Sequence, residues 1–290
     1  MICGGLHGRV DRCFKFEAKN WVESNRMSQG RVGAGAGGVT IGNQLLASGG
    51  IQYTMSFDHV RSQELIGLNT KSSYPDLPSN LAGLQGHCIV KDEINDHIVI
   101  LGGVGPGVPP RFNRRTYIAK NAIAAHTFKD EELMWWKVIG PNMHMNEGRQ
   151  NLGCTIVKVG NKQYIMAVGG TSENDNTHKS IEYLDISDWT NLDYSSKWVR
   201  GHPLPRDNSF LVRHFAMATT PDADEVYMLG GNWEGGKYKK YKWSCQDSTL
   251  DSCRFRGLTD EDEFVTMQGS RISRVAIPLP EELAYDICAY

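Results

Sequence analysis

Several features common in membrane proteins, secreted glycoproteins and nucleic-acid-binding proteins are missing from this 290-residue sequence. It has no run of about 18 apolar residues, so a transmembrane helix is not predicted. The first residues lack the basic segment and apolar core of a signal peptide, and no Asn-x-Ser/Thr sequon marks a glycosylation site. The 31 Lys and Arg against 33 Asp and Glu give a net charge of −2, too little to attract nucleic acid or an anionic membrane.

Patterns typical of metal sites and catalysis are missing as well. The nine histidines contain no pair at the spacing of a zinc helix or knuckle. The context Met143-His144-Met145 could suggest copper, but we favour a solvated or structural role for each histidine. The acidic run 260–263 lacks the glycine and the spacing of a calcium loop, and no Ser/His/Asp or Cys/His set stands out. We therefore predict no metal and no cofactor.

Two further patterns have a structural explanation that we prefer. The segment 33–38 satisfies G-x-G-x-x-G, but it precedes a strand and no helix follows, so a dinucleotide site is not predicted. The run 237–243 is basic and aromatic, like a nucleic-acid patch. It lies where a strand is expected, however, and period two places Tyr241 and Trp243 on one side with Lys240 and Lys242 on the other.

What the sequence does contain is a repeat in which a short apolar run ends in a glycine pair. A strand that ends in two glycines can turn sharply, because glycine tolerates positive φ and has no Cβ to meet a neighbouring sheet. The second glycines are 45, 53, 67 and 61 residues apart, close to the period of about 50 for one four-stranded propeller blade. The pairs are Gly4-Gly5, Gly49-Gly50, Gly102-Gly103, Gly169-Gly170 and Gly230-Gly231.

The strands around each glycine pair are predicted in a fixed order. In the fourth repeat we expect an inner strand at 153–159, a second strand at 163–168, a third at 180–185 and an outer one at 197–199. The other repeats follow this order, with Trp21, Trp136 and Trp198 in outer strands of the first, third and fourth. The sequence therefore predicts an all-β protein with one domain over residues 1–290.

Gly-Gly after an apolar strand, then Tyr in the third strand and Trp in the fourth, resembles the kelch repeat of β-propellers. The resemblance implies a ring of radially packed four-stranded sheets whose long loops share one face, the face that kelch propellers usually present to a protein ligand. Because the family also includes enzymes, the fold does not determine the function.

The seven cysteines are compatible with two redox environments. Cys245 and Cys253 are eight positions apart, as expected for two facing strands of a hairpin. Cys3 and Cys13 lie on either side of a similar loop. Both pairs can be disulfides in an oxidising compartment or strand thiols in the cytosol. The pattern Cys3-Gly4-Gly5, Cys13, Trp21 resembles cysteine-bearing kelch-type propellers of extracellular proteins, which favours an extracellular location over a cytoplasmic one.

A protein ligand is the expected partner, and two groups of residues are candidates for the ligand face. Arg31, Arg149 and Arg206 each lie between an outer strand and the next inner strand, where a guanidinium binds either ligand carboxylates or backbone carbonyls between blades. Further anchors are expected in the long Pro-rich loop and in the loop of the fifth repeat, because Arg and aromatic residues dominate interfaces. These anchors are Arg111, Phe112, Arg114, Arg115 and Trp233.

The leading hypothesis is a non-catalytic protein-binding propeller, and two alternatives remain open. One is an enzyme or carbohydrate-binding ring with a pocket at the axis, which requires several convergent polar groups. The other is the substrate-recognition part of a ubiquitin-ligase adaptor. We also expect five recognisable sheets with a strand at 270–277 near the N-terminus. Either this strand pairs beside Ile2-Cys3 and closes five blades, or, as we prefer, the ring is an N-terminally truncated six-bladed propeller.

Overall fold

The structure is a computed structural model that describes 15 segments of the chain. They are residues 2–3, 11–17, 20–31, 39–42, 44–52, 58–67, 70–77, 84–105, 111–119, 137–138, 144–172, 179–189, 197–205, 210–233 and 240–258. These residues form antiparallel β-sheets, and their helical content is the short 3-10 turn Leu250–Ser252. The prediction of an all-β chain is therefore confirmed.

Five sheets follow one another along the chain, each with its strands paired in order. Sheet 1 consists of β1 (Ile2–Cys3), β2 (Cys13–Glu17) and β3 (Asn20–Glu23). Sheet 2 consists of β4 (Thr40–Ile41), β5 (Gln44–Ser48), β8 (Gln63–Ile66) and β9 (Lys71–Tyr74), and β6 (Ile51–Gln52) pairs with β7 (Asp58–His59) beside it.

The last three sheets have longer strands. Sheet 3 consists of β10 (Gln85–Asp92), β11 (His97–Gly105), β13 (Thr116–Ala119) and β14 (Lys137–Val138), with β12 (Arg111–Phe112) added to β11. Sheet 4 consists of β15 (Gly153–Val159), β16 (Lys162–Val168), β17 (Ile181–Asp185) and β18 (Val199–Arg200). Sheet 5 consists of β19 (Phe210–Thr219), β20 (Val226–Trp233), β21 (Lys240–Cys245) and β22 (Cys253–Gly257).

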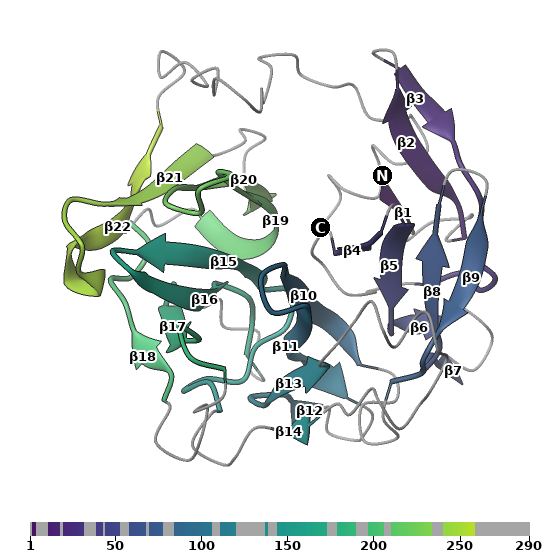
Figure 1. Ribbon diagram of the computed structural model, residues 1–290, viewed down its shortest axis with the longest axis horizontal. Helices are drawn as coiled ribbons and strands as arrows, with labels where there is room; N and C mark the ends of the chain where they lie inside the picture. Colours follow the sequence, from purple (N-terminus) through teal and green to yellow (C-terminus); the bar gives the residue numbers. More distant parts are fainter. Residues whose placement is uncertain are drawn as a thin grey trace.

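The sheets stand around a common centre with β4, β10, β15 and β19 on the inside (Figure 1). A hydrophobic cluster fills the space between each pair of consecutive sheets. Strand β11 shows why its sequence is continuously apolar. Ile98 and Ile100 pack toward sheet 2, whereas Val99 and Leu101 pack toward sheet 4, and all four are fully buried. A strand buried on both faces has no polar alternation.

The fourth repeat agrees with its predicted strand order, since β15 has the predicted bounds and β16 and β17 differ by one residue at the start. In sheet 5, Tyr241 and Trp243 are buried at 4% and 0% exposure, as period two predicts, while Lys242 reaches Glu225 on the other side. Trp198 is buried and its indole N–H donates to Thr116 Oγ1 at 3.2 Å.

The glycine pairs have the conformation that their sequence pattern requires. Residues 49, 50, 102, 103, 169 and 170 all have positive φ. At Gly102 a Cβ atom would lie 2.6 Å from the carbonyl oxygen of Arg149, and at Gly170 it would lie 2.6 Å from that of Gln150. The glycines therefore allow the end of a second strand to contact the segment that leads into β15, from sheet 3 at Gly102 and from sheet 4 itself at Gly170. Gly230 and Gly231 lie inside β20.

Two disulfides join described cysteines. Cys245 and Cys253 are opposite each other on β21 and β22 with Cα atoms 3.9 Å apart, so the predicted hairpin bridge is confirmed. The second disulfide, Cys88–Cys154, was not predicted from the sequence; it joins the inner strands of sheets 3 and 4 with Cα atoms 5.9 Å apart. Cys3 and Cys13 are also direct partners in the register of β1 and β2. Disulfides favour an oxidising environment.

Several predicted features lie outside the described residues. These are Gly4, Gly5, Trp136, Arg206, the glycine-rich segment 33–38 and the expected strand at 270–277. The position of that strand relative to the N-terminus stays a prediction.

Candidate functional site

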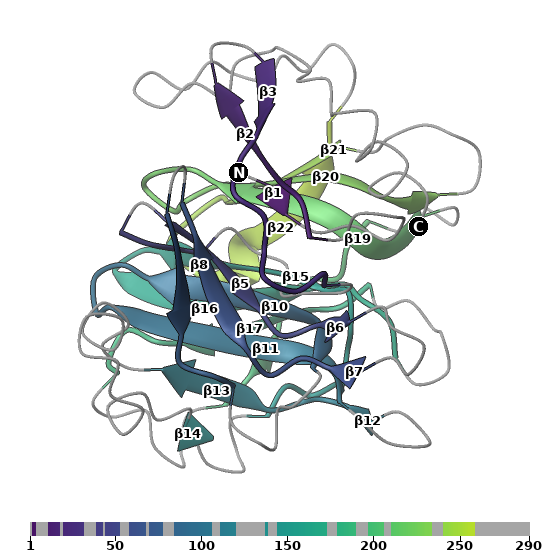
Figure 2. The same ribbon diagram turned by 90° about the vertical axis from the view of Figure 1, so that its right-hand side faces the viewer.

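The connections between second and third strands and the linkers between sheets lie on one side of the molecule, which we call the loop face. Figure 2 shows β6, β7 and β12, which belong to these connections, on the same side. The opposite side carries the hairpin turns between first and second strands, and we call it the hairpin face. Antiparallel pairing places these two sets of connections on opposite sides of the molecule, because they join a second strand at its two opposite ends.

One backbone hydrogen bond recurs on the loop face in four consecutive sheets. In each, the residue two positions before β2, β8, β13 or β17 accepts a hydrogen bond at its carbonyl from the linker that leaves the sheet. The N···O distances are 2.8 to 2.9 Å, and the donor–acceptor pairs are Met27–Asp11, Leu77–Arg61, Met145–Arg114 and Leu204–Lys179. The acceptor residue is basic in three of the four sheets, so the loop face presents positive charge at equivalent positions.

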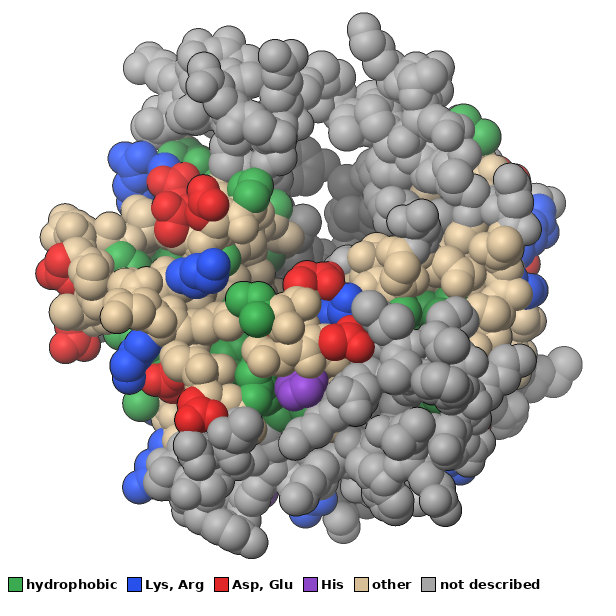
Figure 3. Space-filling model, viewed as in Figure 1, with side chains coloured by type: hydrophobic (Ala, Val, Ile, Leu, Met, Phe, Trp, Pro, Cys, Tyr) green, Lys and Arg blue, Asp and Glu red, His purple; other side chains and the backbone are tan. Residues whose placement is uncertain are grey.

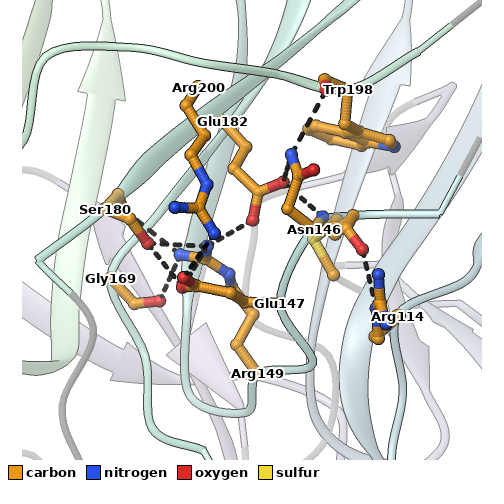
Figure 4. Close-up of polar contacts among 10 residues, drawn as sticks. Arg114, Asn146, Glu147, Arg149, Gly169, Ser180, Glu182, Trp198 and Arg200 are labelled. Atoms are coloured by element: carbon orange, nitrogen blue, oxygen red, sulfur yellow. Dashed lines mark hydrogen bonds and ion pairs between the residues drawn. The ribbon is translucent and has the colours of Figure 1, made fainter.

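Arg114 is held on this face by more than one contact. Its backbone carbonyl accepts from Met145 N–H, and its own Nε donates to the Met145 carbonyl, each at 2.8 Å (Figure 4). The turn before it is fixed by Asn113, whose N–H donates to the Gly103 carbonyl at 2.8 Å and whose Oδ1 accepts from Arg115 N–H at 3.0 Å. Both arginine side chains are exposed at the end of a rigid turn.

His144 joins these two arginines to form the basic cluster, defined here as Arg114, Arg115 and His144. Partial burial and the positive charges of Arg115 and Arg114 lower the pKa of His144. Burial raises the pKa of Tyr117, and the neighbouring Arg115 opposes that shift. No carboxylate among the residues that the structure describes forms an ion pair with Arg114 or Arg115. The basic cluster is therefore able to bind an anionic group.

The other predicted loop-face arginines have a different role. Arg149 is fully buried and donates to the carbonyl oxygens of Gly169 and Ser180 at 2.9 and 3.2 Å and to Glu182 Oε1 at 2.5 Å (Figure 4). Burial lowers the pKa of Arg149, and Glu182 opposes that shift. The guanidinium thus satisfies internal carbonyl and carboxylate groups, so Arg149 is removed from the ligand-face candidates.

Arg31 occupies the same position before sheet 2. It is 1% exposed and donates to the carbonyl oxygens of Gly49 and Ser62 at 3.0 and 2.6 Å and to Glu64 Oε1 at 2.7 Å. Of the two roles that the sequence left open, Arg31 and Arg149 both satisfy internal carbonyls, because burial leaves no guanidinium surface for a ligand. The correction applies to both residues.

A sequence signal for these buried arginines exists but lies outside the glycine pattern. The two linkers read Met-Ser-Gln-Gly-Arg at 27–31 and Met-Asn-Glu-Gly-Arg at 145–149. The methionine N–H binds the previous sheet, and the next residue's N–H donates to the carboxylate that also binds the arginine, at 2.6 Å in both linkers. The shared Met-x-x-Gly-Arg pattern indicates a structural arginine.

The remaining anchors are placed by their strands. Arg111 and Phe112 form β12, which pairs with Val104 and Gly105 of β11, and the Phe112 side chain is half-buried. Trp233 ends β20 opposite Phe210. Of the predicted anchors, the structure therefore brings Arg114 and Arg115 together as an exposed pair, and it adds His144, which the sequence did not single out for ligand binding.

A cavity of about 390 Å³ lies on the other side, where the inner strands meet. It is lined by residues of β10, β15 and β19 and by Val39, so four consecutive sheets contribute to it. The hairpin face is turned toward the viewer in Figure 3, where acidic and basic side chains lie side by side near the centre.

The described residues contain neither a metal-binding cluster nor a membrane-spanning helix. Among these residues no group of three or more His, Cys, Asp or Glu side chains is arranged to hold a metal ion. Within the same part of the chain, no helix has the length and apolar character needed to cross a membrane.

Comparison with known proteins supports the fold. No family model matches the sequence, and no curated protein matches it. The structure is similar to the solved structure of YjhT, with a TM-score of 0.56 and 13% sequence identity over 83% of this chain and 76% of that chain. At this identity the similarity concerns the fold alone. Together with the ring of four-stranded antiparallel sheets, it supports a β-propeller.

Proposed function

We propose that the chain is a non-catalytic, kelch-type propeller that binds a protein ligand on its loop face. The observation that carries this proposal is the exposed pair Arg114 and Arg115 on a turn fixed by Asn113 and Met145. Arg114 and Arg115 have no carboxylate partner within the described part of the chain, and a guanidinium can bind a ligand carboxylate through two parallel hydrogen bonds. A rigid turn lowers the entropic cost of that contact.

The chemistry of the basic cluster favours a ligand that brings carboxylates. Two arginines and a histidine lie together, and each positive charge disfavours protonation of His144. An acidic segment of the ligand would reverse this effect and raise the pKa of His144. Because the whole chain has a net charge of −2, attraction comes from this local surface and not from the protein as a whole.

An extracellular location is part of the proposal. It is supported by the disulfides Cys88–Cys154 and Cys245–Cys253, because bridges of this kind persist in oxidising compartments.

The test starts from partners captured from native tissue, identified by mass spectrometry and purified. We expect Arg115→Glu and Arg114→Glu each to weaken the affinity of the true ligand at least about tenfold, as for interface hot spots. Arg254→Glu changes an exposed arginine on β22 and serves as the matched control, with an expected change below about twofold. Arg114→Lys retains the positive charge but removes the Nε contact with the Met145 carbonyl, so it separates the role of the charge from that of the turn.

The proposed site is wrong if alanine at both Arg114 and Arg115 leaves the affinity of every partner unchanged. NMR titration of His144 adds an independent measurement, since the bound ligand should raise the pKa of that imidazole. A partner whose binding is equally sensitive to Arg254→Glu would show that contacts on the loop face are non-specific.

A further inference from the structure

The cavity on the hairpin face has walls that are fixed in place. The disulfide Cys88–Cys154 joins β10 to β15 beside it. On the next wall, Lys158 N–H donates to the Ala223 carbonyl at 2.6 Å, and the hydroxyls of Thr155 and Thr219 are hydrogen-bonded to each other. Three inner strands are therefore linked to one another, so the cavity exists before any ligand binds. Its volume of about 390 Å³ lies within the range of small-molecule sites.

The lining of this cavity combines polar and apolar side chains, and the apolar ones are aliphatic. Val39 and Ile89 are 3% and 1% exposed, and Ile156 and Met217 are among the other apolar residues of the lining. No aromatic ring is among the described lining residues. An aliphatic chain gains free energy on entering such a space because it leaves water.

The charged side chains at the cavity differ in whether they have an oppositely charged or hydrogen-bonding partner within the protein. Lys91 has a side chain that is 7% exposed, and its ammonium binds Glu93 at 2.5 Å and lies 3.7 Å from Asp96. Asp92 is fully buried, and its carboxylate accepts hydrogen bonds from Asn95 and from the Trp189 indole. All of these charges therefore have internal partners.

Lys158 differs from them. It is exposed, it lines the cavity, and no carboxylate among the described residues lies within ion-pair distance of its ammonium. A ligand ammonium would be repelled by Lys158 and would find Glu93 already paired with Lys91. A neutral head group would form no ion pair. A single carboxylate would complete the charges of the site.

We propose that this cavity binds a small aliphatic monocarboxylate, with the carboxylate at Lys158, the chain between Ile156 and Met217, and hydroxyl contacts from Thr155 and Thr219. Lys158 lies at the end of β15, and the apolar residues lie further along the inner strands, so head group and chain are bound at opposite ends. The proposal is independent of protein binding on the loop face, because the cavity lies on the hairpin face, at the opposite side of the molecule.

The test compares three ligands with the same chain length, hexanoate, hexanol and hexylamine, by isothermal titration calorimetry on the intact oxidised chain. We expect hexanoate to bind about tenfold more tightly than hexanol, the change that one ion pair of about 1.4 kcal/mol produces, and hexylamine to bind most weakly. Lys158→Met keeps most of the side-chain volume and should reduce hexanoate affinity to that of hexanol. Lys162→Met is the matched control. Lys162 belongs to the same β15–β16 hairpin as Lys158, but its ammonium is already paired with Asp185 of β17.

A second variant tests the apolar part of the site. Ile156→Trp should fill the cavity and abolish binding of hexanoate and hexanol alike, while far-UV circular dichroism verifies that the variant is folded. The proposal is overturned by equal affinity for hexanoate and hexylamine, by equal effects of Lys158→Met and Lys162→Met, or by a folded Ile156→Trp protein that binds hexanoate as tightly as the parent. Failure of these measurements would leave the loop-face proposal unaffected.

Discussion

The linkers 27–31 and 145–149 enter sheets 2 and 4 with the same buried geometry and different surroundings. In both, an arginine with at most 1% exposure binds two carbonyl oxygens, one serine hydroxyl and one glutamate of the third strand. The shared contacts are made by the two terminal guanidinium nitrogens, which are buried and therefore need internal acceptors.

The difference lies at the middle residue of each linker. Ser62 donates to the neutral Gln29 at 3.4 Å, whereas Ser180 donates to the charged Glu147 at 2.8 Å. Glu147 also binds Arg200, which is 61% exposed, at 3.0 Å. The first linker is therefore an isolated ion pair and the second is a network that reaches solvent. Since networks are more strongly coupled than isolated pairs, the two linkers should respond differently to substitution.

Removal of each arginine should have the largest effect. Arg149→Met leaves Glu182 fully buried without its cation and should lower the free energy of unfolding by about 4 kcal/mol, within the range for broken buried ion pairs. Arg31→Met should cost about 3 kcal/mol, because Glu64 is 7% exposed and regains some solvent. Urea unfolding monitored by tryptophan fluorescence measures both. An equal or reversed order would contradict the expectation that the more deeply buried glutamate depends more on its arginine.

A pH series sharpens the description of the first linker. Burial acts to raise the pKa of Glu64, but hydrogen bonds from Arg31 and Ser28 outweigh it, so the pKa lies below the ordinary 4.5. The charged form is thus favoured by folding, and its contribution is complete above pH 4.5 and is lost as the pH falls through the folded-state pKa.

Glu64→Gln should therefore cost about 2 kcal/mol at pH 7, as for a hydrogen-bonded charged group, and the difference from the parent should shrink below pH 4.5. Unfolding free energies at pH 7, 5, 4 and 3 test this. A difference that stays constant through acid pH would mean that Glu64 does not carry its negative charge in the folded protein.

An exchange of the middle residues should have the smallest effect. Glu147→Gln removes the link to Arg200 and should cost about 0.5 kcal/mol, with less effect at high salt, because the site is partly exposed. Gln29→Glu places a carboxylate where no equivalent of Arg200 is among the described ion pairs, so we expect no gain in stability. Thermal unfolding at low and high salt compares the two variants.

Local patterns predicted the fold well. The strands of sheet 4 are visible as apolar runs bounded by glycine and asparagine, and Cys245 and Cys253 are eight residues apart in one hairpin. In contrast, Cys88 and Cys154 are 66 residues apart on different sheets. Their pairing depends on how the inner strands meet at the centre, and spacing along one strand contains no information about that.

The site was harder to predict for a related reason. Arg114 and Arg149 are both arginines near sheet junctions, yet one is exposed and the other is buried. What separates them is the presence of Glu182 on the third strand, 33 residues beyond Arg149. The charge of a residue is written in the sequence, but its compensation depends on a partner that only the folded chain brings near.

The Cys88–Cys154 bridge also determines how the molecule would respond to mechanical load. A force applied to the ends of the chain would travel through the sulfur–sulfur bond and bypass the segment between the two cysteines, 66 positions long. At about 3.4 Å per extended residue, roughly 220 Å of chain would stay hidden from the pull. Strands β11 and β13 of sheet 3, which lie between the two cysteines, would thus stay shielded in the middle of the stretched protein until the bridge is reduced.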